Sequence, residues 1–281
     1  MTPDLLFHKT YTHSSSKEWV VFVHGAGGSS NIWFRQIKAF KKHFNVLLLD
    51  LRGHGESAPL KTKSLLPSRY TFKDVSQDIL HVLDHLAISR AHFVGISLGT
   101  ILIRNIEELA PERVKSMVLG GAVTQFNFRS AFLVKLGDMF KHVMPYMWLY
   151  RLFAFVLMPK KSQSLSRNMF IRDAKKLCQK EFKRWFKLAG DVNPLMKFYK
   201  ESRTKTPLLY LMGEEDHMFI GPVRESAARH PSAQLQEIAD SGHVCNVDQA
   251  VTFNQYSIDF IQSQISIDVE PQQEADIVLR R

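Results

Sequence analysis

The chain has 281 residues, of which 45% are hydrophobic and 11% aromatic, enough to bury the core of one large domain. It carries a formal net charge of +10, and no apolar run reaches the roughly 18 residues that a membrane-spanning helix needs. The N-terminus lacks the basic region of a secretory signal, and Cys178 and Cys245 form neither a metal-binding spacing nor a disulfide framework. A reducing cytoplasm is therefore the expected location.

Apolar runs and helical patterns alternate through the first half of the chain. Residues 19–23 and 46–49 are continuous apolar runs, typical of strands buried on both faces of a parallel sheet. The first run ends in the glycine-rich loop 24–30 and the second in the glycine-rich turn 50–57. Apolar residues on one face of the stretch 72–86 then predict a helix.

The next stretch places a serine between a strand and a helix. An apolar run at 93–94 leads into Gly-Ile-Ser-Leu-Gly at 95–99, and a helical pattern covers 101–109. A G-x-S-x-G pattern in this context is typical of a sharp turn that holds its serine at the end of a sheet. Ser97 is therefore the candidate nucleophile, which needs a base and an acid from elsewhere in the chain.

The alternation breaks in the middle of the chain and then resumes. Residues 125–200 have the pattern of several helices, with Pro145, Pro159 and Pro194 at their expected ends. The remaining strands and the last helix are expected at 116–119, 208–212, 234–238 and 247–261. Strands that alternate with helices predict an α/β fold, with a mostly parallel sheet, helices on both faces and right-handed crossovers.

This break divides the chain into a core and an insert. Residues 1–124 and 206–265 are expected to form the α/β core, and 125–205 a helical cap over the C-terminal edge of the sheet. The polar stretch 266–281 is expected to be a loose tail. Residues 1–18 are polar and irregular, and we expect them to end in a short edge hairpin.

Two further loops supply the groups that a serine nucleophile needs. His243, after the last predicted strand, is the candidate base, and Asp216, after the strand before it, is the candidate acid. All three groups follow strand ends at one edge of the sheet, in the order Ser97, Asp216, His243 that is typical of a serine-elbow enzyme. Glu214 and Glu215 are rivals of Asp216 that we interpret as solvated loop charges.

The attacked carbonyl oxygen also needs hydrogen-bond donors for its developing negative charge. Leu98 N–H lies at the expected start of a helix, where backbone donors are unpaired and the helix dipole favours an anion. Ala26 N–H, in the first glycine-rich loop, is expected to be the second donor. His24 is interpreted as a support of that loop, and the turn with Arg52 and His54 as architectural.

Together these segments resemble the α/β-hydrolase superfamily. The matching segments are His-Gly-Ala-Gly at 24–27, Asp-Leu-Arg-Gly-His-Gly-Glu-Ser at 50–57, Gly-Ile-Ser-Leu-Gly at 95–99, Gly-Glu-Glu-Asp at 213–216 and Gly-His at 242–243. The resemblance implies an eight-stranded sheet, a cap inserted after the sixth strand and a Ser-Asp-His triad. Within the superfamily the chain looks most like serine carboxylesterases, enol-lactonases and short-acyl thioesterases, since a dehalogenase or epoxide hydrolase would have aspartate in place of Ser97.

The predicted insert is both basic and aromatic. Residues 125–205 hold 18 Lys and Arg against five Asp and Glu, and 15 of the chain's 31 aromatic residues. The apolar residues of the insert either only pack the cap or also line an acyl pocket. The expected pocket residues are His24, Gly25, Met144, Trp148 and Val244. The basic amphipathic run 175–187 fits an anionic membrane surface or an anionic substrate, whereas no nucleic-acid recognition motif accompanies the charge.

The sequence therefore predicts a serine hydrolase that cleaves small carboxylic esters or thioesters with an apolar acyl part, without a metal or organic cofactor. One alternative is a lipase, phospholipase or lactonase that docks on membranes by its basic cap. Another is a non-catalytic ligand-binding protein of the same fold. The complete candidate triad favours catalysis, because binding alone does not require three such residues together.

Overall fold

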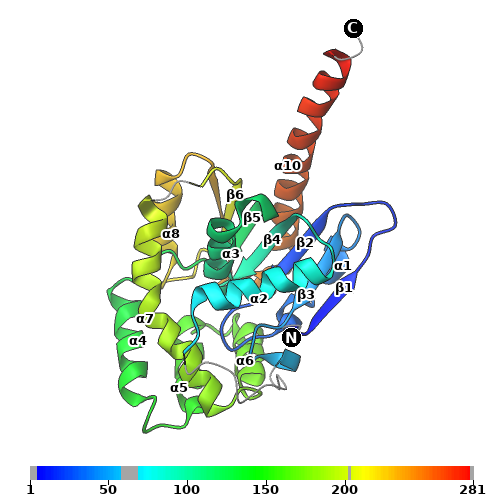
Figure 1. The fold of residues 1–281 in the computed structure, drawn as a ribbon. Coiled ribbons are helices and arrows are strands. Elements are labelled where there is room, and N and C mark those ends of the chain that lie inside the picture. Colours follow the sequence, from blue (N-terminus) through cyan, green and yellow to red (C-terminus); the bar gives the residue numbers. More distant parts are fainter. Residues whose placement is uncertain (1–4, 58–68, 202–203, 279–281) are drawn as a thin grey trace.

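A seven-stranded sheet forms the centre of the protein (Figure 1). The computed structural model describes residues 5–57, 69–201 and 204–278. The strands are β1 (His8–Tyr11), β2 (Trp19–Val23), β3 (Asn45–Leu49), β4 (Ala91–Ile96), β5 (Val114–Gly120), β6 (Leu208–Gly213) and β7 (Ala233–Ile238). Their order is β1-β3-β2-β4-β5-β6-β7, and all neighbours are parallel except β1 and β3.

Helices cover both faces of this sheet. One face carries α2 (Phe72–His85), α3 (Leu98–Leu109) and α8 (Ile220–Arg229), and the other carries α1 (Ile37–Phe40), α9 (Cys245–Asp248) and α10 (Ala250–Val278). Short 3-10 helices are η1 (Ser30–Trp33), η2 (Gly55–Ser57) and η3 (Pro111–Arg113). Successive side chains of β2 enter opposite cores: Val21 lies under α2 and α3, and Phe22 under α1. Burial on both faces is the reason why these strands are continuous apolar runs.

Four helices lie between β5 and β6. They are α4 (Phe128–Phe140), α5 (Tyr146–Leu157), α6 (Ser164–Ala174) and α7 (Gln179–Glu201), and Figure 1 shows them together at one end of the sheet. The side chain of Asn127 caps α4 by accepting from Ser130 N–H, and Pro145 directly precedes α5. Pro194 was expected at a helix end, but it lies inside α7. A proline within a helix removes one backbone donor, and here the helix continues past it.

The described part of the chain has one strand fewer than the resemblance implies. With seven strands in place of eight, the inserted helices follow the fifth strand and not the sixth. The difference lies before β2, where the predicted hairpin is the single strand β1. After β1 the ring of His13 accepts hydrogen bonds from Ser15 N–H and Ser16 N–H, so a local turn takes up backbone donors that a second strand would have used.

The last helix extends further than the sequence predicts. α10 continues to Val278, so residues 266–278 are helical where a loose tail was expected. Helical hydrogen bonds form within the segment itself and need no core, and the Ala, Glu and Gln residues in this stretch favour them. In Figure 1 the end of α10 projects beyond the sheet. Among the helices that the structure describes, none has the length and apolar character to cross a bilayer.

Candidate active site

Ser97 lies at the sharp turn between β4 and α3. Its backbone has φ +55° and ψ −122°, a left-handed conformation that is costly for a residue with a side chain. Two glycines make the turn possible. A Cβ on Gly99 would lie 2.2 Å from the Val23 carbonyl oxygen, and one on Gly95 would lie 2.5 Å from the Ile103 side chain. The G-x-S-x-G spacing is therefore required by the close approach of α3 to the sheet.

A hydrogen-bonded chain joins the three residues that the sequence singled out. His243 Nε2 lies 2.9 Å from Ser97 Oγ, and His243 Nδ1 lies 2.8 Å from Asp216 Oδ2. A carboxylate only accepts, so Nδ1 carries the proton and Nε2 is free to accept from the serine hydroxyl. Phe219 N–H and Met218 N–H donate to the other oxygen, Asp216 Oδ1. Asp216 and His243 are almost fully buried, which strengthens the interaction between them.

The rival carboxylates lie elsewhere. Glu215 forms an ion pair with Lys160 at 2.6 Å and accepts from Gln163 Nε2, so its contacts are with the insert. Glu214 is exposed at the surface. Of the three acidic residues in this loop, Asp216 is the one that contacts His243.

The two expected backbone donors lie beside the serine. Leu98 is the first residue of α3, so its N–H has no partner within the helix. Ala26 follows Gly25, where an added Cβ would lie 3.0 Å from Ser97 Cβ. Ala26, Leu98, Ser97 and His243 all line the same cavity. A carbonyl oxygen placed there is within reach of the donors as well as the serine and the histidine.

This cavity has a volume of about 200 Å³ and an almost wholly apolar wall. The inserted helices supply much of that wall, namely Ser130, Leu133, Val134, Tyr150, Phe153, Leu157, Phe170, Phe182, Trp185, Phe186 and Val192. A second cavity of about 50 Å³ also borders Ser97 and His243, and the expected residues His24, Gly25 and Val244 line it. Asp173 also lines this smaller cavity, and its carboxylate accepts from Ser29 Oγ at 2.7 Å.

The two pocket residues expected from the insert lie outside both cavities. Trp148 is 63% exposed, and Met144 packs against the insert's own apolar cluster. For Trp148 the reason is the helical period, since residues three and four positions apart share a face of α5. Tyr150 and Phe153 therefore face the cavity, and Trp148 faces solvent.

Known proteins match both the sequence and the fold. A family model described as the alpha/beta hydrolase fold matches residues 18–141. An enol-lactonase structure from Burkholderia xenovorans superposes with a TM-score of 0.76, at 21% identity, over 92% of this chain and 96% of that one. A hydrolase structure from Oleispira antarctica gives a TM-score of 0.77, at 18% identity, over 92% and 95%. Residues 18–141 therefore match the α/β-hydrolase family, and the chain has the α/β-hydrolase fold.

Two curated relatives of this chain differ in how much they share. "Putative carbamate hydrolase RutD" of Stutzerimonas stutzeri is 29% identical over 255 residues, covering 87% of this chain and 92% of the relative. The acetyltransferase component of the acetoin cleaving system of Pseudomonas putida is 42% identical over 100 residues, which are 36% of this chain and 25% of that protein. The family model and the Stutzerimonas relative support a hydrolase.

The loop that carries Ala26 is held in place by two buried histidines. His24 accepts from Leu51 N–H at 3.0 Å and donates to the Gly25 carbonyl at 2.7 Å. His54 accepts from Gly27 N–H at 2.9 Å and donates to the Arg52 carbonyl at 3.1 Å. Burial lowers the pKa of His54 to about 3, so the ring stays neutral and keeps one donor and one acceptor. The sequence identified this turn as architectural but contained no signal that it holds the loop with the expected donor Ala26, which we call the donor loop.

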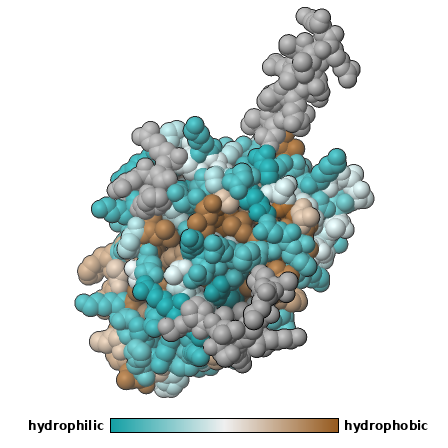
Figure 2. Space-filling view, viewed as in Figure 1, coloured by the Kyte–Doolittle hydropathy of each residue, from teal (hydrophilic) through white to brown (hydrophobic). Residues whose placement is uncertain are grey.

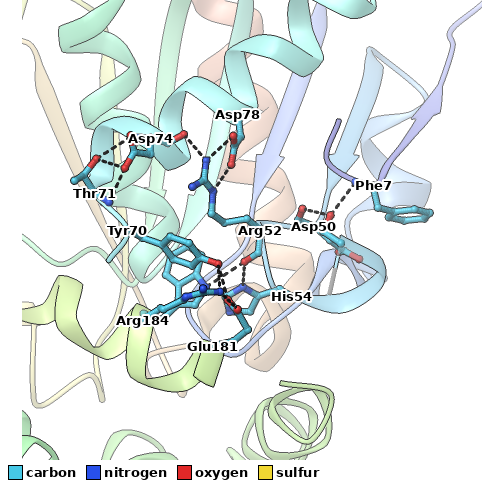
Figure 3. Close-up of polar contacts among 12 residues, drawn as sticks. Phe7, Asp50, Arg52, His54, Tyr70, Thr71, Asp74, Asp78, Glu181 and Arg184 are labelled. Carbon is cyan, nitrogen blue, oxygen red and sulfur yellow. Dashed lines mark hydrogen bonds and ion pairs between the residues drawn. The ribbon is translucent and has the colours of Figure 1, made fainter. Parts of the chain in front are cut away.

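The inserted helix α7 is bonded to the same turn (Figure 3). Glu181 accepts from the Tyr70 hydroxyl at 2.7 Å and pairs with Arg184, and Trp185 Nε1 donates to the Arg52 carbonyl at 3.1 Å. The Arg52 guanidinium pairs with Asp78 of α2. The turn therefore ties the insert, the core helix α2 and the donor loop to one another.

Replacing His54 by alanine is expected to lower kcat by about 100-fold, with a much smaller change in KM, because Gly27 N–H loses its acceptor and the donor loop shifts. Glutamine offers a carbonyl oxygen as a replacement acceptor, so His54→Gln should recover most of the loss. Steady-state kinetics on an ester, with melting temperatures as the folding control, measure both effects. Equal losses in the two variants would show that the acceptor for Gly27 N–H is not what His54 contributes.

Proposed function

We propose that the protein is a serine hydrolase that cleaves carboxylic esters or thioesters with an apolar acyl part. The observation that carries this proposal is the hydrogen-bonded chain from Ser97 Oγ through His243 to Asp216 in an apolar cavity. In this proposal residues 1–124 and 206–265 are the catalytic core, and 125–205 are the cap that shapes the substrate cavity.

The reaction begins with attack of Ser97 Oγ on the carbonyl carbon of the substrate. His243 Nε2 takes the hydroxyl proton as the new carbon–oxygen bond forms, and Asp216 stabilises the resulting imidazolium. The carbonyl oxygen becomes an oxyanion that accepts from Ala26 N–H and Leu98 N–H. Collapse of this intermediate expels the alcohol or thiol, which receives the proton from His243, and leaves an acyl-enzyme on Ser97.

Water then releases the acyl group by the reverse sequence of proton transfers. His243 removes a proton from a water molecule as it attacks the acyl carbon, and the same two N–H groups hold the second oxyanion. His243 returns the proton to Ser97 Oγ as the carboxylic acid leaves. The chain's own residues therefore supply the base, nucleophile and oxyanion donors, and no cofactor is needed for these steps.

The cavity wall supports an apolar substrate over a small polar one. A dry cavity of about 150 Å³ lined by aliphatic and aromatic side chains is large enough for benzene. The larger cavity here, at about 200 Å³, therefore accommodates a ring or a short alkyl chain. A small carbamate, the kind of substrate that the name of the Stutzerimonas relative suggests, would leave most of this apolar wall without contacts.

Turnover of a substrate panel tests this proposal. The panel contains nitrophenyl esters of graded chain length, acyl-CoA thioesters, lactones and a small carbamate. We expect kcat/KM to rise at least about tenfold from acetate to octanoate, because added methylenes enter the apolar cavity. His243→Ala should abolish turnover. The matched control is His217→Ala, at an exposed histidine, which should leave turnover unchanged. Turnover of the carbamate alone would replace the proposed substrate class, and no turnover of any substrate by folded protein would favour the non-catalytic alternative.

A further inference from the structure

The outer surfaces of α4 and α5 expose a group of large apolar side chains. Seven of the twelve exposed large apolar side chains in the described part of the chain come from this helix pair and the turn between its members. We call them the outer apolar face: Phe128, Phe132, Met139, Val143, Trp148, Leu152 and Phe155. Phe128 is 87% exposed and Val143, in the turn, is 76% exposed. Figure 2 shows tan and brown atoms at the lower left edge, where Figure 1 places α4.

The opposite surfaces of the same helices line the larger cavity. Leu133 and Val134 of α4 and Tyr150 and Phe153 of α5 point inward, between the residues of the outer apolar face. Both helices are therefore apolar on two sides. Amphipathic surface helices keep one polar side toward water, and a helix that is apolar all round is normally buried. The outer apolar face thus has the composition of a surface that is normally covered by another molecule or by lipid.

The charges around this face favour an anionic partner. Residues 128–157 contain Arg129, Lys135, Lys141 and Arg151 but a single acidic residue, Asp138. Asp138 is ion-paired with Lys141, which leaves three exposed basic side chains beside the apolar ones. Exposed Trp, Phe and Leu next to an excess of Lys and Arg over acidic residues is the composition of helices that lie in the headgroup region of anionic bilayers.

A second copy of the chain fits this face less well. In a symmetric dimer the same patch meets itself, so the three basic side chains of one copy would lie against the equally basic patch of the other. Such like-charge contacts oppose association, whereas anionic lipid headgroups compensate the charges. We infer that the outer apolar face docks on an anionic lipid surface, with α4 and α5 lying along the headgroups.

This location differs from the membrane contact that the sequence suggested. The apolar residues of the run 175–187 are turned inward: Leu177, Phe182 and Trp185 are buried, and Phe186 lines the cavity. Docking by α4 and α5 leaves those residues in place. It also brings the helices that wall the substrate cavity to the phase where apolar esters dissolve, a consequence that rests on the proposed function, although the docking itself does not.

Cosedimentation of the full chain with vesicles tests the docking. Vesicles of phosphatidylcholine with about one third phosphatidylserine should bind the protein at least about tenfold more strongly than pure phosphatidylcholine. Phe128→Ser, Phe132→Ser and Trp148→Ser together should reduce that binding at least about tenfold. The matched control changes three exposed apolar residues elsewhere: Phe34→Ser, Leu109→Ser and Val251→Ser. Binding should persist in the control, and hydrolysis of a water-soluble ester should be unchanged in both variants.

A charge series separates the two basic surfaces. Arg129→Gln, Lys135→Gln and Arg151→Gln together should weaken binding to the anionic vesicles, whereas Lys175→Gln, Lys176→Gln and Lys183→Gln should not. The inference is overturned if the wild type does not bind, if the serine variant of the outer face binds as well as its control, or if sedimentation velocity shows a dimer that this variant abolishes. Binding is also measured with Ser97→Ala, so that failure of the proposed chemistry leaves the docking result interpretable.

Discussion

Replacement of Ser97 by alanine is expected to lower kcat by roughly 10⁵- to 10⁶-fold, because the nucleophile and the first proton transfer disappear together. The residual rate comes from the oxyanion donors and from substrate binding. Alanine adopts the same left-handed backbone at no greater cost than serine, so the fold and the melting temperature should be preserved. Initial rates on the best ester of the panel, measured over several hours at high enzyme concentration, give the value.

A second experiment distinguishes Ser97 from Cys245 as the nucleophile. Cys245 lies two residues after His243, and burial raises the pKa of its thiol to about 12, so it is a neutral thiol at ordinary pH. Native protein treated with iodoacetamide should therefore keep its activity, even where the exposed Cys178 is alkylated. Activity that survives in Ser97→Ala but disappears on alkylation would transfer the nucleophilic role to a cysteine.

Asp216→Asn is expected to lower kcat by about 10⁴-fold. The Asn carbonyl oxygen can still accept from Phe219 N–H, which turns the amide group toward His243 Nδ1. An amide donor at that position favours the tautomer with the proton on Nε2, and this tautomer cannot accept from Ser97. Steady-state kinetics measure the loss, and unchanged melting temperatures show that it is not a folding defect.

Glu215→Gln is the matched control, since Glu215 is a rival carboxylate in the same loop. Glu215 pairs with the exposed Lys160 and makes no contact with His243, so the substitution should change kcat by less than about twofold. Loss of activity in Glu215→Gln with little loss in Asp216→Asn would show that Glu215, and not Asp216, is the acid.

The juxtaposition of Ser97, Asp216 and His243 could be predicted from the sequence, because the order of strands and loops along the chain fixes where these residues lie. Parallel strands end at one edge of the sheet, so loops after β4, β6 and β7 bring Ser97, Asp216 and His243 together. The order of these residues and the glycines around the serine can be recognised in the sequence without knowing how the helices pack.

The substrate cavity could not be predicted in the same way, because α4, α5 and α7 have apolar residues on more than one side. Periodicity shows that Trp148 and Tyr150 of α5 point in different directions, but only tertiary packing decides which one faces the cavity. The link from His54 to the donor loop depends on a contact between residues 27 positions apart, which no local pattern contains.

Reaction with an alkyl fluorophosphonate, which modifies activated serine nucleophiles, shows whether Ser97 is one. We expect one covalent adduct per chain, mapped by peptide mass spectrometry to Ser97. The adduct should be absent in Ser97→Ala, and its formation should be at least about 100-fold slower in His243→Ala. Folded wild-type protein that remains unlabelled, or an adduct that maps to another residue, would contradict the assignment of Ser97 as the nucleophile.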